Sequence, residues 1–539
     1  MTNKKQRTQR DQIKLFAYHI KKTSHIFQLL FVYVHIATIE YLKRSLLVPS
    51  TSSNCVIKPK KMSSKYEEAV RLLNGLQSNA ATIKKMREQR DFLQTTNLPI
   101  CRKYLETLNI SRNQIDNLNI IHVSGTKGKG STCAFVERIL RDAGFKTGLY
   151  TSPHLVHVRE RIRLNGEPVN EELFSTEFFK VYSELKQYHE TNMPAYFKFL
   201  TLMAFQIFTS QKVDVAIFEV GIGGEYDCTN VIDNPIVCGI TTLDYDHISI
   251  LGSKLSEIAW HKSGIFKNNV PAFYTPTTVE AEEVIKSRAV EKNVPLYSIP
   301  PISSYTFPRE ISTGISGRHQ LLNVSLALQL VNAWFRQKGH SDSTAIFGKP
   351  FEVPTKFCDS IEKCQWPGRS QIIETNRGIT YLLDGAHTPK SMEACAEWAD
   401  MEMKKIEEGN KKLRRILLFQ CTADRCPTTL IPFLKNLKMS QIISCPTQLY
   451  PSLNQSSDST NLNTSRNEQL EKSKMCLESW KISQEENVVD DQMRVFDCIS
   501  NSIDFIENSK NPDENVIVLV TGSLHLVGGV IGLLEKIGK

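Results

Sequence analysis

The hydrophobic positions follow an alternating pattern from about residue 115 to the end of the chain. Short runs that are nearly continuous in apolar residues are separated by stretches in which apolar residues recur at helical spacing. Continuous apolar runs are typical of strands in a parallel sheet covered on both faces, so the pattern predicts an α/β protein. The expected strands are residues 119–124, 147–150, 213–220, 236–241, 380–384, 415–419 and 516–520, and the clearest helices are 131–143 and 319–337.

Breaks in this pattern predict the domain organisation. The stretch 298–304 is rich in proline and serine, which is typical of a linker. We expect one α/β domain over residues 62–305 and a second, smaller one over residues 306–539. Residues 451–475 are dense in Ser, Asn, Thr and charge, so we expect a mobile surface insertion there.

The composition agrees with a folded protein of more than one domain. A chain of 539 residues that is 41% hydrophobic can bury several cores, which excludes wholesale disorder. The formal charge is +9, but residues 1–61 alone hold twelve Lys and Arg against two acids. The rest of the chain is nearly neutral and gives no reason to expect a nucleic-acid partner. The thirteen cysteines include no C-x-x-C pair, which favours free thiols in a reducing compartment.

The basic segment 1–61 resembles a targeting leader. It is poor in acids and contains an apolar run at 26–39, interrupted by Gln28 and His35, that falls short of the ~20 residues needed to span a bilayer. These features favour a mitochondrial presequence. A signal anchor, or an extension ahead of a shorter form that starts at Met62, are the alternatives. We expect no stable transmembrane segment in the body of the chain.

The segment 123–132 carries the clearest chemistry, because it lies between an expected strand and an expected helix. Its glycines let successive backbone N–H groups face one anion, and the helix N-terminus adds its positive end. Lys129 supplies a mobile charge for phosphates, and Ser131 supplies a hydroxyl. Gly130 separates these two residues, so the spacing departs from the common G-x-x-x-x-G-K-[ST] motif. The context nevertheless predicts a nucleotide phosphate loop.

Two further residues lie where an open α/β sheet binds its ligands. Glu219 ends an expected strand, and His247 follows another. Ligands of open sheets bind outside the carboxyl ends of the strands. A carboxylate at that edge suits Mg²⁺, which takes oxygen ligands and substrate phosphates. A strand-end ion pair for Glu219 and an ordinary core role for His247 are the alternatives from the residues alone.

Five motifs stand in order along the chain: Gly125–Ser131, Tyr150–Leu155, Glu219–Gly224, Tyr226–Asn230 and Asp384–His387. Together they resemble those of the folylpolyglutamate synthases, a family in the Mur ligase superfamily of ATP-dependent amide-forming ligases. The likeness runs from about residue 64 to 538 and is closest to the eukaryotic branch. It implies a P-loop-containing, Mur-ligase-like ATPase domain followed by a smaller Rossmann-like α/β domain.

The resemblance also implies roles for particular residues. Lys262 matches a lysine that many superfamily members carbamoylate to bind a second metal ion, and an unmodified structural lysine is the equal alternative. His387 would assist the reacting phosphoryl group. The residues implied to contact ATP are Gly125, Gly128, Lys129, Gly130, Ser131, Arg369 and Asp384; those implied to bind Mg²⁺ are Ser152, Glu219 and His247; and those implied to act in catalysis are Lys129, Lys262 and His387.

The family's reaction is implied as well. ATP would phosphorylate the γ-carboxylate of a reduced folate, and the amine of L-glutamate would attack the acyl phosphate. The expected cofactors are ATP and Mg²⁺, with a monovalent cation such as K⁺ as a further candidate. We expect a monomer in the mitochondrion and the cytoplasm. A dihydrofolate synthase or bifunctional enzyme and a non-catalytic nucleotide-binding regulator are the alternatives; intact Lys129, Glu219 and His247 argue against the regulator. A cell-wall Mur ligase has no support in the sequence.

Two features raise questions of detail. Gln420 and Cys426 stand where the family commonly has Asn and Asp, which leaves the role of that second-domain loop open. Within the phosphate loop, only Lys129 has glycines on both sides. We therefore expect Lys129 to follow the phosphates and Lys127 to point outward as a solvated side chain.

Overall fold

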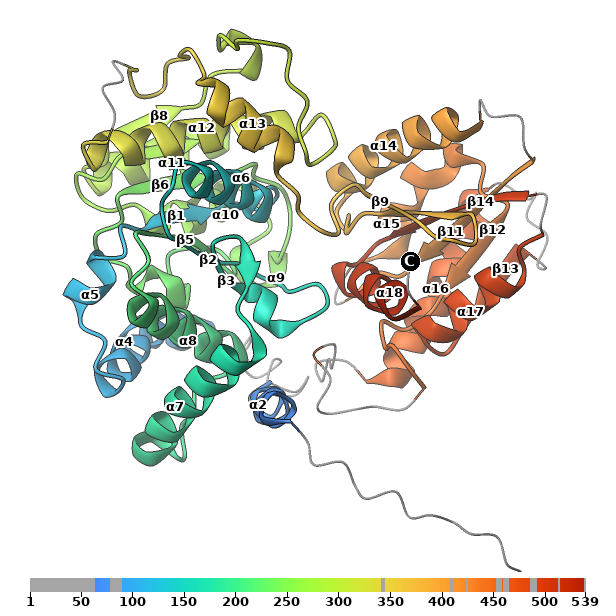
Figure 1. Cartoon of the computed structure of the whole chain (residues 1–539), viewed down its shortest axis with the longest axis horizontal. Helices are drawn as coiled ribbons and strands as arrows, with labels where there is room; N and C mark the ends of the chain where they lie inside the picture. The colour runs from blue at the N-terminus through green and yellow to red at the C-terminus, as the bar shows by residue number, and fades with distance from the viewer. Residues whose placement is uncertain are drawn as a thin grey trace, which may run out of the picture. The chain divides into compact units, whose positions relative to one another are not determined.

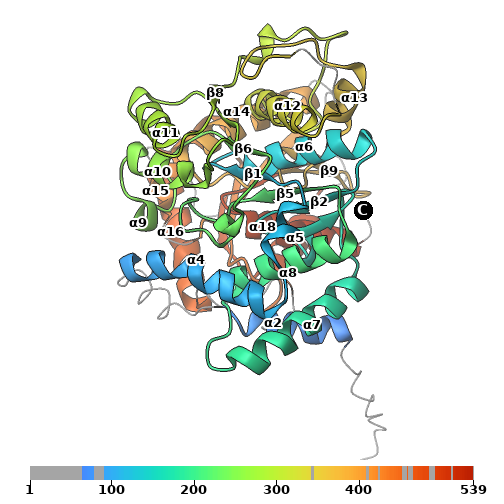
Figure 2. The same ribbon diagram turned by 90° about the vertical axis from the view of Figure 1, so that its left-hand side faces the viewer.

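Two mixed β-sheets, each covered by helices on both faces, organise the chain (Figures 1 and 2). The structure is a computed structural model that describes residues 64–77, 90–340, 345–407, 412–422, 425–451, 458, 465–484, 492–511 and 514–537. The leader expected at 1–61 lies outside the described residues. Within them, none of the helices combines the length and the hydropathy needed to cross a membrane.

The first sheet has eight strands. Six consecutive strands are parallel, and the two strands at one edge run antiparallel to their neighbours. Side chains on β5 (Val215–Glu219) alternate between two cores, since Ile217 faces one and Phe218 the other. In spatial order the strands are β4 (Glu167–Pro168), β3 (Ile162–Leu164), β2 (Thr147–Tyr150), β5, β1 (Ile121–Ser124), β6 (Val237–Ile240), β7 (Ala272–Tyr274) and β8 (Leu296–Ser298).

Helices cover both faces of this sheet and complete what we call the first lobe. One face packs against α6 (Lys129–Asp142), α12 (Gln320–Gln337) and α13 (Thr355–Lys363). The other packs against α2 (Lys65–Asn74), α4 (Arg90–Thr107), α5 (Arg112–Asp116), α7 (Glu171–His189), α8 (Tyr196–Gln211), α10 (Leu255–Lys262) and α11 (Val279–Glu291). Shorter helices are α9 (Ile248–Leu251), η1 (Val158–Arg161), η2 (Cys228–Val231), η3 (Ser263–Ile265) and η4 (Ile302–Ser304).

The second lobe is a six-stranded sheet with its own two cores, parallel except for one edge strand. Its strands, in spatial order, are β13 (Met493–Val495), β12 (Gln441–Ser444), β11 (Lys412–Phe419), β14 (Glu514–Thr521), β10 (Ile379–Leu383) and the antiparallel β9 (Gln371–Glu374). Its helices are α14 (Pro389–Glu407), α15 (Pro427–Leu430), η5 (Ile431–Leu437), α16 (Arg466–Ser483), α17 (Ile499–Asn508) and α18 (Leu524–Ile537).

The boundary between the lobes differs from the one expected near residue 305. Val324 and Trp334 of α12 share a core with Ile121 of β1, and the Trp334 indole donates to the Asn119 carbonyl at 2.9 Å. α13 packs against α6 as well. The first lobe therefore extends to about residue 364, because 298–304 is a loop within it and not a linker between lobes. Residues 63–539 form one compact unit.

The segment expected as a mobile insertion at 451–475 lies only partly within the described residues. Residues 452–457 and 459–464 lie outside the described residues, whereas 466–475 form the first half of α16. Ser465 caps this helix in a reciprocal pair with Glu468. Gln420, which departs from the family pattern, donates through Nε2 to the Gln469 carbonyl at 3.0 Å and to Ser473 Oγ at 2.9 Å. The departure thus anchors α16 to the second sheet.

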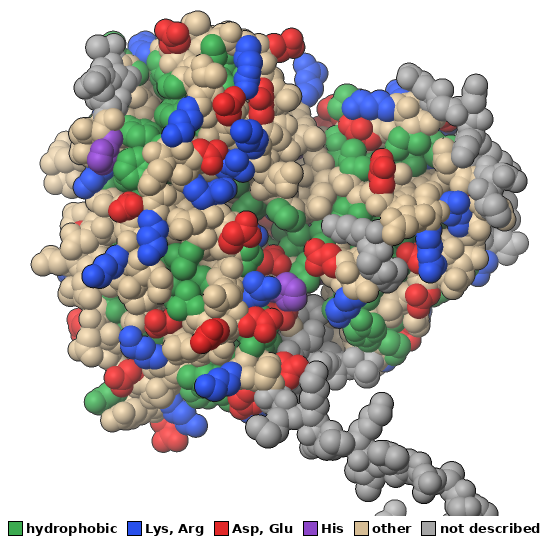
Figure 3. All heavy atoms as spheres, in the orientation of Figure 1, with side chains coloured by type: hydrophobic (Ala, Val, Ile, Leu, Met, Phe, Trp, Pro, Cys, Tyr) green, Lys and Arg blue, Asp and Glu red, His purple; other side chains and the backbone are tan. Residues whose placement is uncertain are grey.

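The described surface and cysteines fit the composition. On the face drawn in Figure 3, basic and acidic side chains lie interspersed among the described residues. Each cysteine in the described part of the chain is a free thiol, and all except Cys426 are buried. Such thiols behave as small apolar side chains of the cores.

Candidate active site

Four neighbouring strands of the first sheet, β2, β5, β1 and β6, bring their carboxyl ends to one edge. The phosphate loop follows β1, Ser152 follows β2, Glu219 ends β5, and His247 follows β6. Because the strands are parallel neighbours, residues that are far apart in the sequence meet there. The structure therefore places the predicted first-lobe residues on one edge.

The phosphate loop has the conformation that its glycines permit. Gly125 has φ +146°, and a Cβ there would lie 1.8 Å from Thr241 Oγ1. Gly128 has φ +86° and begins α6, whose N-terminus has no side-chain cap. That uncapped end, followed by Lys129, Gly130 and Ser131, leaves the positive pole of the helix available to an anion.

The buried Glu219 carboxylate bonds to the backbone of Ser152 beside this loop. The Ser152 amide donates to Glu219 Oε2 at 2.9 Å, and Lys129 Nζ lies 4.0 Å from Glu219 Oε1. The Glu219 side chain is only 6% exposed. Burial raises the pKa of its carboxyl group, and the Lys129 charge opposes that shift. A carboxylate held in this way is poised to take a cation.

His247 lies at the end of the loop after β6, with φ +53° as the first residue before α9. Burial lowers its pKa to about 4, and the neighbouring Asp246 carboxylate opposes the shift. The imidazole is therefore neutral near pH 7, which is the form that binds metal ions. The Lys129 charge lowers the pKa of both His247 and Glu219.

Lys262 bonds to the backbone of the phosphate loop. It ends α10, is buried, and donates from Nζ to the Gly125 carbonyl at 2.7 Å. Burial lowers its pKa well below the usual value. A neutral amine is the form that reacts with carbon dioxide, and a charged one would serve as a structural donor. Both alternatives expected for Lys262 thus stay open.

The second lobe contributes Arg369 and Asp384. Asp384 follows β10; its carboxylate accepts from the Ser370 amide at 2.8 Å and from the Ala386 amide at 2.9 Å. Burial lowers the pKa of the Arg369 guanidinium, and the charges of Asp384 and Glu219 oppose that shift. The Arg369 guanidinium therefore interacts electrostatically with one acid of each lobe, Glu219 of the first and Asp384 of the second.

One contact between the lobes joins His387 to Lys127. Lys127 Nζ lies 2.7 Å from His387 Nε2 and 3.2 Å from Asp246 Oδ2, and its side chain is 20% exposed. Arg425 lies 3.7 Å from Asp246 Oδ1. The expectation that Lys127 points outward into solvent is wrong, because two partners hold it at the site. Asp246 and Arg425 are further residues that sequence reasoning missed.

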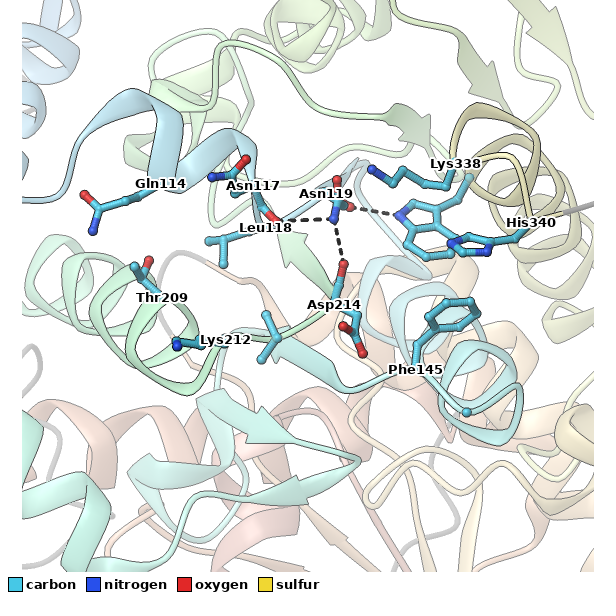
Figure 4. A pocket seen from close by; sticks show the side chains of 13 residues that line it. Gln114, Asn117, Leu118, Asn119, Phe145, Thr209, Lys212, Asp214, Lys338 and His340 are labelled. Carbon is cyan, nitrogen blue, oxygen red and sulfur yellow. Dashed lines mark hydrogen bonds between the residues drawn. The ribbon is translucent and has the colours of Figure 1, made fainter.

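A hollow of about 790 Å³ lies at the amino edge of the first sheet, opposite the carboxyl edge (Figure 4). It is lined by residues that precede the strands, among them Asn119, Phe145 and Asp214, together with Trp334 and His340 of the α12 end. No residue predicted for the site lines it. Because open α/β sheets bind ligands at the carboxyl edge, the size of this hollow does not make it the reaction site.

Relatives of known name match nearly the whole chain. A Caenorhabditis elegans protein that carries the name folylpolyglutamate synthase is 62% identical over 504 residues, which covers 91% of this chain and 98% of that protein. The mitochondrial folylpolyglutamate synthase of Homo sapiens is 37% identical over 552 residues, covering 88% and 93%. A family model described as dihydrofolate synthetase, C-terminal domain, matches residues 371–533.

Solved structures share the fold and confirm the predicted α/β class. A folylpolyglutamate synthase from Thermotoga maritima has a TM-score of 0.63 at 25% identity and covers 88% of this chain and 97% of that one. The enzyme from Mycobacterium tuberculosis, complexed with ADP and AMPPCP, has a TM-score of 0.62 at 20% identity, covering 87% and 99%. By identity and coverage, this chain belongs to the folylpolyglutamate synthase family, whose members are ligases that form carbon–nitrogen bonds.

Proposed function

We propose that this protein uses ATP to add L-glutamate, in γ-linkage, to tetrahydrofolates and their polyglutamates. The observation that carries the proposal is the carboxyl edge of the first sheet, where the phosphate loop, the buried Glu219 carboxylate with its Ser152 partner and the second-lobe residue His387 meet. The identity to the named relatives supports the substrate class.

We assign different roles to the site residues. The amides of Gly128 to Ser131 and the Lys129 ammonium would hold the ATP phosphates, and Arg369 and Asp384 would hold the nucleotide from the second lobe. Transfer of the γ-phosphoryl group to the folate carboxylate forms an acyl phosphate and ADP. The glutamate amine then forms the amide and releases phosphate. Lys129 and Arg369 would neutralise charge on the phosphoryl group, and positioning of the reactants is the main catalytic contribution expected of such a site.

Ser152, Glu219 and His247 fit a magnesium ion in part. Two oxygen donors and a neutral imidazole suit an ion that keeps several water and phosphate ligands. Three acidic, His or Cys side chains close enough to bind a metal are not found among the described residues, as expected when one ligand is a serine. Bound there, the ion would offset the charge of the phosphates. A monovalent cation stays a further candidate.

A direct assay tests the proposal. Purified full-length protein is incubated with ATP, Mg²⁺, labelled glutamate and tetrahydrofolate, and products are resolved by chain length. We expect glutamate to enter a γ-linked product with one ADP formed per bond. No incorporation would overturn the proposal.

Dihydrofolate synthase is a second candidate, favoured by the description of the family model that matches residues 371–533. It would use the same phosphate site with the carboxylate of dihydropteroate. Replacing tetrahydrofolate by dihydropteroate in the assay separates the two. Glutamate incorporation with both substrates would indicate a bifunctional enzyme.

We also propose that the full chain reaches mitochondria and that a form starting at Met62 stays in the cytoplasm. The support is the basic, acid-poor composition of residues 1–61 and the mitochondrial names of the bovine and human relatives. A fusion of residues 1–61 to a fluorescent reporter should enter mitochondria. Delivery to the secretory pathway would favour the signal-anchor alternative.

A further inference from the structure

The phosphate loop holds a second lysine whose contacts the proposed reaction does not use. Lys127 lies two residues before Lys129, yet its side chain meets different partners. Lys129 faces Glu219 within the first lobe, whereas Lys127 bonds to His387 of the second lobe and to Asp246. The two lysines therefore have separate environments.

The geometry fixes the protonation of His387. Its Nδ1 lies 2.6 Å from the Gly385 carbonyl oxygen, which can only accept, so Nδ1 carries the proton. Burial, followed by the Lys127 charge, lowers the His387 pKa to about 3, so the ring is neutral. Nε2 is then an acceptor, and the Lys127 ammonium is the group that donates to it.

Asp246 explains why the ammonium is needed. Its Oδ2 lies 3.4 Å from His387 Nε2, so that two acceptors face each other. Lys127 lies within hydrogen-bond distance of both and relieves their repulsion. The other oxygen, Oδ1, accepts from the His247 amide at 3.0 Å. One ammonium thus links the phosphate loop, the loop after β6 and the second lobe.

A parallel contact strengthens this junction. The Thr388 hydroxyl donates to Asp244 Oδ2 at 3.1 Å, and the Thr126 hydroxyl donates to the Asp244 carbonyl at 3.0 Å. The residues that flank Lys127 and His387 are therefore joined as well.

We infer that Lys127 is a positioning residue of the ligase: it holds the neutral His387 imidazole of the second lobe against the phosphate loop. The inference rests on the proposed function, since the chemistry it serves is phosphoryl transfer at that loop. Loss of Lys127 leaves His387 Nε2 and Asp246 facing each other without a donor. The ring then turns away, and the reacting groups are no longer aligned.

The test compares Lys127→Met, Lys127→Arg, His387→Ala and the double variant in the glutamate assay, after wild-type activity has been shown. We expect Lys127→Met to lower kcat about 10- to 100-fold, the usual range for a lost hydrogen bond to a charged group. KM for ATP and the affinity for fluorescent ADP should change less than about threefold, because Lys129 remains. Arg, which also donates to two acceptors, should restore most of kcat.

Non-additivity separates positioning from an independent role. If Lys127 acts through His387, the double variant should be no more than about threefold slower than His387→Ala alone. Three outcomes would each overturn the inference. The kcat losses of the two single variants could multiply in the double variant, the kcat of Lys127→Met could stay within twofold of wild type, or Lys127→Met could lose ADP affinity in parallel with kcat. Lys146→Met is the matched control, since that lysine bonds to the Gln211 carbonyl at the opposite edge; its kcat should be unchanged. Should Lys127→Met fail to fold, Lys127→Gln serves the same comparison.

Discussion

The charged groups at the two edges of the first sheet differ in how far they are buried. At the carboxyl edge, Glu219 and Lys262 are buried and bond to the backbone of neighbouring loops. At the amino edge, the wider hollow is lined by exposed charges such as Lys212 and Asp214. Charges interact far more strongly when they are removed from water. The comparison teaches that buried charge held in a fixed position, and not the volume of a hollow, indicates the candidate active site at the carboxyl edge.

The strongest test of this comparison removes one charge from each edge. Glu219→Gln should lower the ligation rate at least about 1000-fold, because a buried carboxylate that would bind the cation becomes neutral. The thermal midpoint should stay close to wild type, since glutamine keeps the acceptor for the Ser152 amide. Asp214→Asn at the amino edge is the control and should leave the rate within twofold. Near-wild-type turnover in Glu219→Gln would remove this residue from the site.

The next largest effect is expected for Lys129→Met. This change should lower kcat about 100- to 1000-fold, because the charge on the phosphoryl group grows in the transition state. Unlike Lys127→Met, it should also weaken ADP binding. The measurements are the ligation rate at saturating ATP and an ADP titration. If Lys127→Met weakened ADP binding more than Lys129→Met, the assignment of the phosphate lysine would be reversed.

Two glycines with positive φ offer a smaller, matched comparison. An alanine at Gly128 has φ strain, and its Cβ would also lie 2.1 Å from Asn323 Oδ1; at Gly144, which lines the hollow, no atom lies within 4 Å of the Cβ. Each change should cost at least about 1–2 kcal/mol of unfolding free energy. Only Gly128→Ala should also lower the ligation rate, by tenfold or more on the scale of ~1.4 kcal/mol per tenfold. Equal rates in the two variants would contradict a role for the loop conformation.

The last expected effect concerns the pH dependence of stability. The pKa of His387 is about 3 when folded, against an ordinary value near 6.5, so the unfolded chain binds the proton first. Its contribution to stability is present above pH 6.5 and falls by about 1.4 kcal/mol per pH unit on acidification toward the folded pKa. His387→Gln should therefore flatten the loss of stability between pH 7 and pH 5, measured by urea unfolding. The exposed His340→Gln should not; a flatter profile there as well would break the comparison.

The sequence predicts the central strands β2, β5, β1, β6, β11, β14 and β10, because buried parallel strands are nearly continuous in apolar residues. The strands toward the sheet edges, β3, β4, β7, β8, β9, β12 and β13, give no such signal and are missed. The sequence also placed Glu219 and His247 at strand ends, although which strands are neighbours is decided by packing across the sheet. The environment of Lys127 could not be predicted, since its partners Asp246 and His387 lie 119 and 260 residues away. Local spacing carries no information about such contacts.

The missed half of α16 had one readable signal. Ser465 and Glu468 form the S-x-x-E pattern that begins many helices, and the structure shows both of its hydrogen bonds. The segment was assigned to an insertion because polar residues dominate it. Its buried side is small and includes Ser473, Cys476 and Trp480, so no clear apolar stripe marks the helix.

The docking of α16 through Gln420 has a consequence for building chimeras between relatives. Gln420 gives both amide hydrogens to α16 and accepts from the Cys476 thiol through Oε1 at 3.4 Å. A relative with a shorter side chain at this position cannot reach the same three atoms. Transplanting the helix without the glutamine would leave buried polar groups unpaired, so residue 420 and α16 have to be exchanged as one unit.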